Sequence, residues 1–583
     1  MLLLLCWQYL RTRLRDVALI LFLQVAAALA GLNLPDINAR IIDEGVATGS
    51  TGVIWSLGGL MLAIALVQGV CTALAVWFGA KVSMGLGAWL RHRVFTHAQR
   101  LSIQDVHHYG APSLITRSTN DVQHIQMVVL MSFSIMVTAP IMGIGGVIQA
   151  VRQNLELSGV LAVLIPLLIA IFGILSFKLY PIFGQLQVRT DEINTVLREE
   201  LTGIRVIRAF ARIPFISDRY RTANDNLRDV SMILGAIFAV LFPLVGLVVN
   251  AANVAVVWFG AGLVDSGQAN IGALFAFLNY VGMIFMAVML SSMVFMMVPR
   301  ASVCAQRIHE ILDHQPTVFS PETGKKADSP ELSSQWSFAL DNASMQYPGA
   351  ESAVLENIDL PLPAGTTTAI IGATGAGKTT LVNLLPRLMD PTGGHVLANG
   401  IPVDQIDLGD LRGRIAVVPQ RAHLFSGTIA SAVSCSNDLD EAGRERVRWA
   451  LAGAQALEFV DRLEDGIDSP VEPGGKNFSG GQRQRLCIAR ALYRQADLYI
   501  FDDSFSALDQ ATDAALRRGL PEYVGNAAVV VVAQRVASIR TADVIIVLDH
   551  GQIVGRGRHE DLLQTCPTYK EIVDSQASSE EAA

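Results

Sequence analysis

The sequence predicts an α-helical six-span transmembrane domain followed by an α/β P-loop nucleotide-binding domain. Two observations support this prediction. Of the 583 residues, 51% are hydrophobic and only 16% are charged, and the long apolar runs all precede residue 300. Beyond that point, residues 372–379 (GATGAGKT) match the phosphate-binding pattern G-x-x-x-x-G-K-[ST] in full. Such a chain is too long for one core and too apolar for an ordinary soluble enzyme.

Six apolar runs are long enough to cross a hydrocarbon core of about 30 Å, which requires about 20 helical residues. They cover roughly residues 17–34, 53–80, 127–151, 157–177, 230–264 and 271–298. The fifth run is too short for two spans and a turn, so we expect a single helix that continues beyond the membrane.

Basic residues predict the orientation of the chain. Arg11, Arg13 and Arg15 precede the first span, and the loops at about 81–126 and 178–229 are rich in arginine, whereas the alternate connections carry few basic residues. By the positive-inside rule, the N-terminus and the α/β domain are cytoplasmic. We expect a multi-pass protein of a bacterial plasma (inner) membrane, in contact with membrane lipid.

The two long inner loops have helical periodicity and lack the glycine and proline of a flexible linker. One of them carries an apolar stripe of Leu201, Ile204, Ile207 and Phe210, spaced three residues apart. Such a stripe outside a membrane needs a partner surface. Packing within a cytoplasmic helix bundle and docking onto the nucleotide-binding domain both remain open.

The membrane spans give one indication of the ligand. Spans two to six contain no ionisable residue, which argues against a proton or ion relay. The sixth span has a methionine-rich face, which suits bulky lipophilic ligands but also occurs in ordinary helix packing. Its members are Met283, Met286, Met289, Met293, Met296 and Met297.

Charge and cysteine content exclude several other classes. A net charge of −8 gives no reason to expect a nucleic-acid partner. The six cysteines lack metal-ligand spacing and imply no disulfide framework. Residues 1–6 are apolar without a basic region ahead of them, so the N-terminus is expected to be retained rather than cleaved as a signal peptide.

Composition also predicts the domain boundaries. The transmembrane domain covers residues 1–313, and residues 314–335, rich in proline, serine and charge, form a linker. The nucleotide-binding domain follows at 336–575, and 576–583 form a tail. A domain of that length lies within the usual size range.

The glycine-rich motif lies in the context that phosphate binding requires. A buried strand is expected at 366–371 (TTTAII) and an amphipathic helix from 380 (TLVNLL). Glycines allow the loop N–H groups to face phosphate oxygens, the lysine supplies a charge at the outer phosphates, and the threonine hydroxyl can hold Mg²⁺. We predict ATP and Mg²⁺ as cofactors, with contacts from Gly372, Ala373, Thr374, Gly375, Ala376, Gly377, Lys378, Thr379 and Thr380.

Two further motifs follow. Residues 498–502 (LYIFD) have the pattern of a buried strand that ends in a carboxylate, which makes Asp502 the expected metal-site acid beside Thr379. Residues 478–482 (FSGGQ) open a helix whose free N–H groups and Ser479 hydroxyl could meet a phosphate, or could be a simple helix cap.

Together these motifs resemble the ATP-binding cassette family, and the order of spans and cassette resembles an exporter-type half-transporter over nearly the whole chain. Residues 478–482 are similar to the family's signature motif, with Phe478 where leucine is usual. The resemblance implies that Gln420 senses metal and nucleotide and also contacts the metal, and that Tyr347 stacks on adenine. Further nucleotide contacts are implied for Ser479, Gly480, Gly481, Gln482 and Asp509, the last in a loop (SALD) that crosses the dimer interface.

The chain departs from the family pattern at two catalytic positions. Asp503 stands where the family has a glutamate as general base, and its carboxylate is one methylene shorter. A displacement of about 1 Å can cost on the order of a hundredfold in rate. Gln534 stands where the family has a switch histidine, and an amide cannot carry the charge or the proton of an imidazole. Both changes together predict a site that binds ATP but hydrolyses it poorly.

In this family two cassettes enclose two nucleotides, each between one P-loop and the signature motif of the other subunit. A weakened P-loop side and a nearly intact signature side favour a heterodimer with a homologous half-transporter subunit. The predicted function is ATP-driven transport of a lipophilic compound, most simply export, with ATP hydrolysis that depends on the partner. The alternatives are a homodimeric slow transporter and an ATP-gated channel or regulatory membrane protein.

Overall fold

The computed structural model describes residues 1–583 apart from 322–323, 327–328, 330–331, 333–334 and 582–583, and gives only the backbone for Ser176, Phe242, Met296 and residues 577–581. Part of the expected linker and the end of the expected tail therefore lie outside the described residues. The chain forms two compact units. Unit 1 comprises Met1–Gln99 and Ala111–His314, and unit 2 comprises Arg100–Gly110 and Gln315–Ala583.

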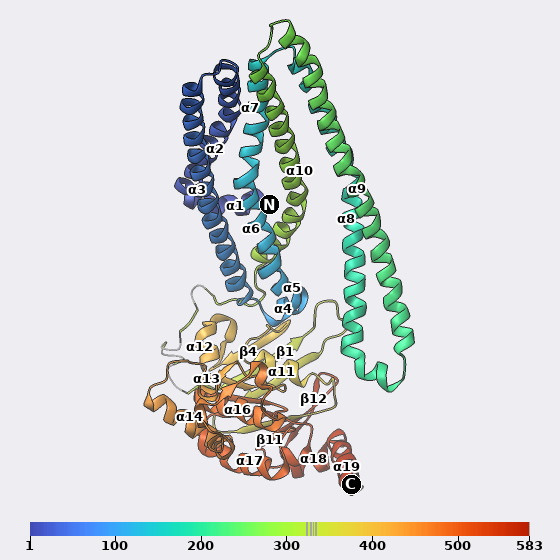
Figure 1. Ribbon diagram of the computed structural model, residues 1–583. Coiled ribbons are helices and arrows are strands. Elements are labelled where there is room, and N and C mark those ends of the chain that lie inside the picture. Colours follow the sequence, from blue (N-terminus) through green and yellow to red (C-terminus); the bar gives the residue numbers. More distant parts are fainter. Residues whose placement is uncertain (322–323, 327–328, 330–331, 333–334, 582–583) are drawn as a thin grey trace. The chain divides into compact units, whose positions relative to one another are not determined.

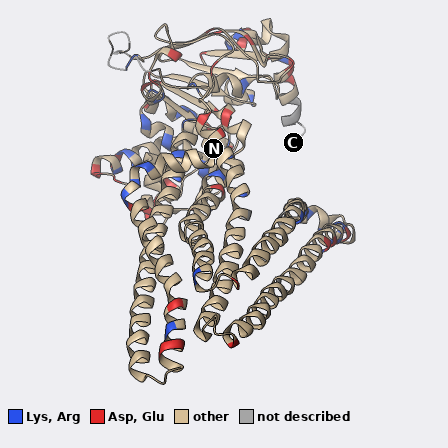
Figure 2. Cartoon of the chain, turned by 90° about the horizontal axis from the view of Figure 1, so that it is seen from above, with Lys and Arg blue, Asp and Glu red and all other residues tan. Residues whose placement is uncertain are grey.

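Unit 1 is helical throughout its length (Figure 1). In the described part of the chain, six helical stretches are long and apolar enough to cross a membrane, which confirms the six-span prediction. Lys, Arg, Asp and Glu residues lie mainly toward the ends of the long helices (Figure 2). The helices are α1 (Leu2–Leu10), α2 (Leu14–Arg40), α3 (Thr51–Ala98), α5 (Ala111–Thr116), α6 (Val122–Met131), α7 (Thr138–Gln153), α8 (Ser158–Ala209), α9 (Ile213–Asp265) and α10 (Ile271–Asp313).

The fifth span and the inner loops have the form that the sequence predicts. Helix α9 is a single helix of 53 residues that pairs with α8 along its length (Figure 1). Both helices extend well beyond their apolar segments, so the inner loop between them is itself helical. The stripe on α8 is largely open within unit 1, because Leu201 is 74% and Phe210 is 72% exposed.

The third span is not one regular helix. A π-helical segment, Arg117–Asp121, separates α5 from α6, and a second, Ser132–Met136, lies just before α7. A π-turn inserts one residue into the helical repeat and rotates the following face. Only the second segment falls within the apolar run expected at 127–151, where apolar composition alone does not reveal such a shift.

The two larger apolar clusters among the described residues of unit 1 form most of its core. One contains Leu168, Phe277 and Tyr280, which are fully buried between α7, α8, α9 and α10. The other surrounds Leu86 and Ile125, where α3 and α6 meet the N-terminal helices and the end of α10. The helices of this unit are thus fixed by packing along narrow apolar seams, while much of their apolar surface faces outward.

Unit 2 contains a mixed six-stranded sheet with strand order β12-β11-β3-β10-β9-β6 and a four-stranded antiparallel sheet with order β2-β1-β4-β5. The first has β3 (Thr367–Ile371), β6 (Ile415–Val418), β9 (Leu498–Asp502), β10 (Ala528–Val532), β11 (Val544–Asp549) and β12 (Gln552–Gly557). The second has β1 (Phe338–Met345), β2 (Leu355–Leu362), β4 (Gly393–Ala398) and β5 (Ile401–Pro402). A short pair joins β7 (Gly427–Thr428) to β8 (Pro470–Val471).

The central strands of the larger sheet are parallel and buried on both faces. All five residues of β9 and all five of β10 are buried, the pattern of a sheet covered by helices on each side. The helices that follow the linker in this unit are α11 (Lys378–Leu384), α12 (Leu408–Gly413), α13 (Ile429–Ser434), α14 (Glu441–Gly453), α15 (Leu457–Asp461), α16 (Gly480–Arg494), α17 (Gln510–Val524), α18 (His559–Thr565) and α19 (Pro567–Glu581). This α/β arrangement confirms the predicted fold class.

A short helix from the first inner loop, α4 (Ile103–Tyr109), belongs to unit 2. Ser102 and Asp105 form a reciprocal capping box at its start. The Asp105 carboxylate, only 3% exposed, also accepts hydrogen bonds from the backbone N–H and the hydroxyl of Thr317 at 3.1 and 3.3 Å. One buried carboxylate thus joins α4 to the segment that follows α10.

Candidate functional site

Parallel register brings three chain segments to one edge of the central sheet. Val532 pairs with Asp502 on one side and with Ile370 on the other, so β3, β9 and β10 end at the same level. The glycine-rich loop follows β3, Asp503 follows β9, and Gln534 follows β10. Carboxyl ends of parallel strands are where α/β proteins bind ligands.

The loop between β3 and α11 requires glycine at two positions. Gly377 has a φ of 99°, and a Cβ there would lie 2.8 Å from the carbonyl oxygen of Val354. At Gly372, a Cβ would lie 2.1 Å from the carbonyl oxygen of Leu548. Any larger residue would push the loop away from its neighbours, so the tight loop geometry depends on these two glycines.

Lys378, the first residue of α11, folds back over the loop. Its ammonium group donates hydrogen bonds to the carbonyl oxygens of Gly372 and Ala373 at 2.8 and 2.7 Å. Burial lowers the pKa of Lys378, while the carboxylates of Asp503 and Asp502 act in the opposite direction. The cation therefore lies inside the loop, where a phosphate can replace the two carbonyls as its partner.

Thr379 and Asp502 place oxygen ligands beside the loop. The Thr379 hydroxyl donates to a carboxylate oxygen of Asp502 at 3.3 Å, and Asp502 is 6% exposed. Burial raises the pKa of the Asp502 carboxyl, and Asp503 acts in the same direction, whereas the Thr379 hydroxyl and Lys378 oppose it. A hydroxyl and a carboxylate at hydrogen-bond distance fit Mg²⁺, which prefers hard oxygen ligands and keeps part of its coordination for water and phosphate.

Asp503 lies at the centre of a small amide cluster. One oxygen of its carboxylate accepts from the Gln420 side-chain amide at 3.2 Å and from the Gln534 amide at 2.9 Å. Its backbone has a φ of 47°, and its N–H donates to the carbonyl oxygen of Val532. A non-glycine residue in this region is uncommon and is often associated with function.

These residues line a cavity of about 310 Å³. The sequence predicted all but two of its lining residues, Val354 and Val532, which are apolar and belong to no chemical motif. The lining consists of Val354, Thr374, Gly375, Gly377, Lys378, Thr379, Thr380, Gln420, Asp502, Asp503, Val532 and Gln534.

Tyr347 lies next to this cavity. Its hydroxyl is 3.2 Å from the Thr380 hydroxyl, and its half-buried ring packs against the core beneath the smaller sheet. The ring therefore remains partly accessible to a flat ligand, while Thr380 links the tyrosine to α11.

The signature residues are not part of the cavity lining. Ser479 caps α16 by accepting from the Gln482 N–H, and Gln482 bonds back to the Ser479 N–H. Phe478 is 7% exposed and packs against Phe459, so the apolar core accommodates the change from leucine. Asp509 caps α17 by accepting from the Thr512 N–H and hydroxyl. Within one chain these groups have helix-capping partners and lie apart from the P-loop.

Gly480 and Gly481 keep the start of α16 open. A Cβ at Gly480 would meet nothing within 4 Å, and one at Gly481 would lie 3.2 Å from the carbonyl oxygen of Ala507. The first two residues of this helix therefore carry no side chain, which leaves room for an anionic ligand to approach the helix N-terminus.

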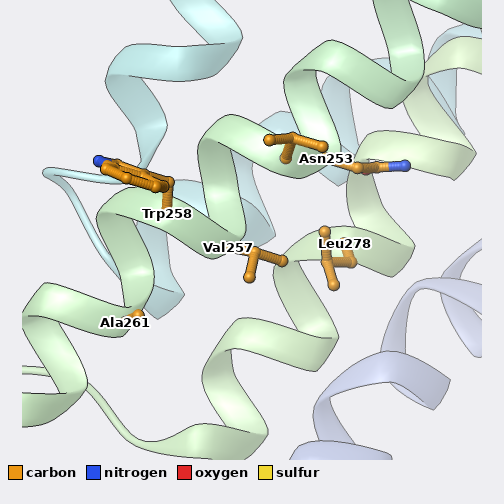
Figure 3. A pocket seen from close by; sticks show the side chains of 6 residues that line it. Asn253, Val257, Trp258, Ala261 and Leu278 are labelled. Carbon is orange, nitrogen blue, oxygen red and sulfur yellow. The ribbon is translucent and has the colours of Figure 1, made fainter.

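A second cavity, of about 660 Å³, lies in unit 1 between α9 and α10. Figure 3 shows Asn253, Val257, Trp258 and Ala261 on one helix and Leu278 on the other. Val254 completes the lining, which is almost entirely apolar. The side-chain oxygen of Asn253 is buried and has no hydrogen-bond partner among the described residues. The methionine-rich face is not among these lining residues, and the Met296 side chain lies outside the described part.

Known proteins are similar in sequence to almost the full chain. Residues 17–288 match the model of the ABC transporter transmembrane region, and residues 355–506 match the ABC transporter model. An uncharacterized ABC transporter ATP-binding protein of Mycobacterium tuberculosis is 44% identical, over 99% of both chains. An ATP-dependent lipid A-core flippase of Pseudomonas fluorescens is 31% identical, over 86% of this chain and 82% of the flippase.

The fold also matches a solved structure. A bacterial Atm1-family ABC exporter with ATP bound gives a TM-score of 0.80 at 21% identity, covering 97% of this chain and 98% of the exporter. At this identity the likeness concerns the fold, and it confirms the order of a helical membrane domain and an α/β cassette. The chain thus belongs to the ABC transporter family and is a multi-pass, ATP-driven half-transporter of the exporter type.

Proposed function

We propose that this chain is one subunit of a heterodimeric ABC transporter in a bacterial inner membrane, with an ATP site of its own that binds nucleotide and hydrolyses it slowly. ATP occupies the cavity at the ends of β3, β9 and β10, with its phosphates on the glycine-rich loop and Lys378. Mg²⁺ binds between Thr379, Asp502 and Gln420, and Tyr347 contacts the base. The proposed parts are the membrane domain at 1–313, the linker at 314–335, the cassette at 336–575 and the tail at 576–583.

The arrangement around Asp503 carries the proposal of slow hydrolysis. Its carboxylate accepts from the amides of both Gln420 and Gln534 through one oxygen. Two amide donors occupy both lone-pair sites of that oxygen, so it has none left to accept a hydrogen bond from an attacking water. Gln534 supplies no group that can carry charge at the outer phosphate. A shorter carboxylate with two amide partners is therefore a poor general base, while the phosphate-binding groups remain complete.

The contrast between the P-loop side, with its altered catalytic groups, and the signature side of the cassette favours a heterodimer. The start of α16 offers open N–H groups and the Ser479 hydroxyl, so this signature surface can complete a site on another subunit. A partner with a glutamate and a histidine at the positions of Asp503 and Gln534 would supply the competent P-loop. In a homodimer, both sites would carry the same weak catalytic groups.

The cavity between α9 and α10 supports a lipophilic substrate. Its lining is almost entirely apolar and includes the indole of Trp258. Small-molecule sites are lined mainly by hydrophobic and aromatic side chains of this kind. The name of the lipid A-core flippase relatives is consistent with a lipid-like compound. Export is the direction that the exporter-type fold favours.

The ATPase activity of the chain with and without its partner tests the proposal. The full chain is purified alone and as the complex that co-purifies from native membranes, and magnesium-dependent turnover is measured in both. We expect the chain alone to bind labelled ATP but to turn it over at least about a hundredfold more slowly than the complex.

The Asp503→Glu, Gln534→His double variant of the isolated chain is the matched control. It restores the family's catalytic groups without changing the P-loop, so we expect its turnover to rise. Rapid magnesium-dependent hydrolysis by the unaltered chain alone would contradict the heterodimer and favour a homodimeric transporter. Tight ATP binding with substrate flux but without hydrolysis in either preparation would favour an ATP-gated channel.

A further inference from the structure

The last helix of the chain contacts the segment that carries Gln534. Helix α19 is anchored by Tyr569, which is fully buried and whose hydroxyl lies 2.8 Å from the imidazole of His559 on α18. Ile572 and Val573, one turn later, pack against the apolar core beneath the larger sheet. These contacts bring the next turn of α19 beside the loop after β10.

Gln576 uses both ends of its side-chain amide on this loop. Its oxygen accepts from the backbone N–H of Val536 at 2.8 Å, and its nitrogen donates to the backbone carbonyl of Gln534 at 2.7 Å. The Gln576 side chain thus bonds to the backbone on both sides of Arg535, as a neighbouring β-strand would. Because two bonds act on adjacent peptide groups, they fix the direction of the backbone as well as its position.

The same loop directs the Gln534 side chain into the ATP cavity. While the Gln534 carbonyl bonds to Gln576, its side-chain amide donates to Asp503 at 2.9 Å and lines the cavity. Arg517 holds the other end of the loop through the carbonyl of Ala537 at 2.9 Å. The loop is therefore supported at two points, and the one nearer to Gln534 comes from the C-terminal helix.

We propose that Gln576 is a positioning residue that holds Gln534 toward the outer phosphate of ATP, so that the C-terminal helix contributes to the discrimination between ATP and ADP. This inference rests on the proposed assignment of Gln534 to the ATP site, but it does not depend on whether the partner subunit is the same or different. Gln576 itself touches only backbone and acts through Gln534.

The affinity of the full-length chain for ATP and for ADP tests the inference. Displacement of a labelled nucleotide is measured for the wild type and for Gln576→Met, which keeps the side-chain length but removes both hydrogen bonds. We expect ATP affinity to fall by about three- to tenfold, the scale of one hydrogen bond, and ADP affinity to stay unchanged, since ADP lacks the outer phosphate. Asp574→Ala, at an exposed position on the same helix, should leave both affinities unchanged.

A double-variant cycle separates positioning from packing. If Gln576 acts through Gln534, then Gln534→Ala should reproduce the loss of ATP affinity, and adding Gln576→Met should weaken it no further. Equal losses for ATP and ADP in Gln576→Met would indicate a purely structural role and overturn the inference. Unchanged ATP affinity in Gln576→Met, with a loss in Gln534→Ala, would overturn it while the proposed ATP site stands. An ATP affinity that is unchanged in Gln534→Ala would overturn both the inference and the assignment of Gln534 to the ATP site.

Discussion

In the described part of the chain, the ammonium group of Lys378 bonds to two carbonyls of its own loop rather than forming an ion pair. These contacts keep the cation in place at the cost of partial desolvation, which is why burial lowers its pKa. A phosphate offers full negative charge in place of two dipoles. The geometry of the loop therefore predicts that a large share of the nucleotide affinity depends on this single side chain.

The first prediction is that Lys378→Ala abolishes tight ATP binding at the P-loop of this chain. Loss of a charge-assisted hydrogen bond costs about 1.5–3 kcal/mol, or roughly ten- to 150-fold in affinity. Crosslinking of labelled ATP to this subunit measures the effect. Lys570→Ala, at an exposed position on α19, is the control and should label normally. Normal labelling of Lys378→Ala would remove the assignment of the site.

The sequence predicted those site residues that lie in contiguous motifs with distinct chemistry. The glycine-rich loop and Asp502 could be recognised from the chemistry of phosphate and metal binding, whereas Asp503 and Gln534 were identified through the resemblance to the ATP-binding cassette family. Val354 could not be recognised from the sequence, since it reaches the cavity only because the loop before β2 packs against Gly377. Gln576 was expected in a tail, because a single glutamine shows no pattern until the fold brings it to the Gln534 loop.

At the level of the element, periodicity predicted helices and strands better than their interruptions. The strand at Leu498–Asp502 and the long helix α9 are confirmed because each has one dominant apolar pattern. The π-helical segments before α6 and α7 were missed, because an inserted residue changes helix phase without changing composition. Strand order was also not predicted, since it depends on pairing between segments that are far apart in the sequence.

Helices α18 and α19 offer a pH-dependent contact. His559 is 8% exposed and bonds to Tyr569. Burial lowers the pKa of His559, Arg540 acts in the same direction, and Glu560 opposes them. The folded state thus favours the neutral imidazole more than the unfolded chain does, so the unfolded or undocked state binds more protons in acid.

The second prediction is that docking of α19 weakens as the pH falls below about 6.5, the ordinary value for histidine, and is at its strongest above it. Hydrogen exchange of the α19 amides at pH 7.5 and 5.5, corrected for intrinsic rates, measures the docking. His559→Gln cannot titrate in this range and should show little difference between the two pH values. Equal protection of wild-type α19 at both values would show that this histidine does not control the contact.

At the scale of the whole molecule, the two halves of the ATP chemistry lie apart within one cassette. The P-loop cavity contains Asp503 and Gln534, and the start of α16 lies outside it. Under the proposed function, such a chain binds ATP by itself and completes a competent site only with another subunit. The third prediction concerns this division of labour.

In the purified heterodimer, Ser479→Arg should stop hydrolysis at the partner's site, because a bulky cation fills the space meant for a phosphate-facing helix start. Ser479→Ala is compared with it, since it removes the hydroxyl and the helix cap, worth about 1 kcal/mol, without adding bulk or charge. Asp503→Asn should leave most of the turnover intact, because a carboxylate displaced by about 1 Å contributes little catalysis. Steady-state ATPase rates of the three variants are compared side by side. If Asp503→Asn proves as damaging as Ser479→Arg, the P-loop site of this chain is catalytic, and hydrolysis is shared by both subunits.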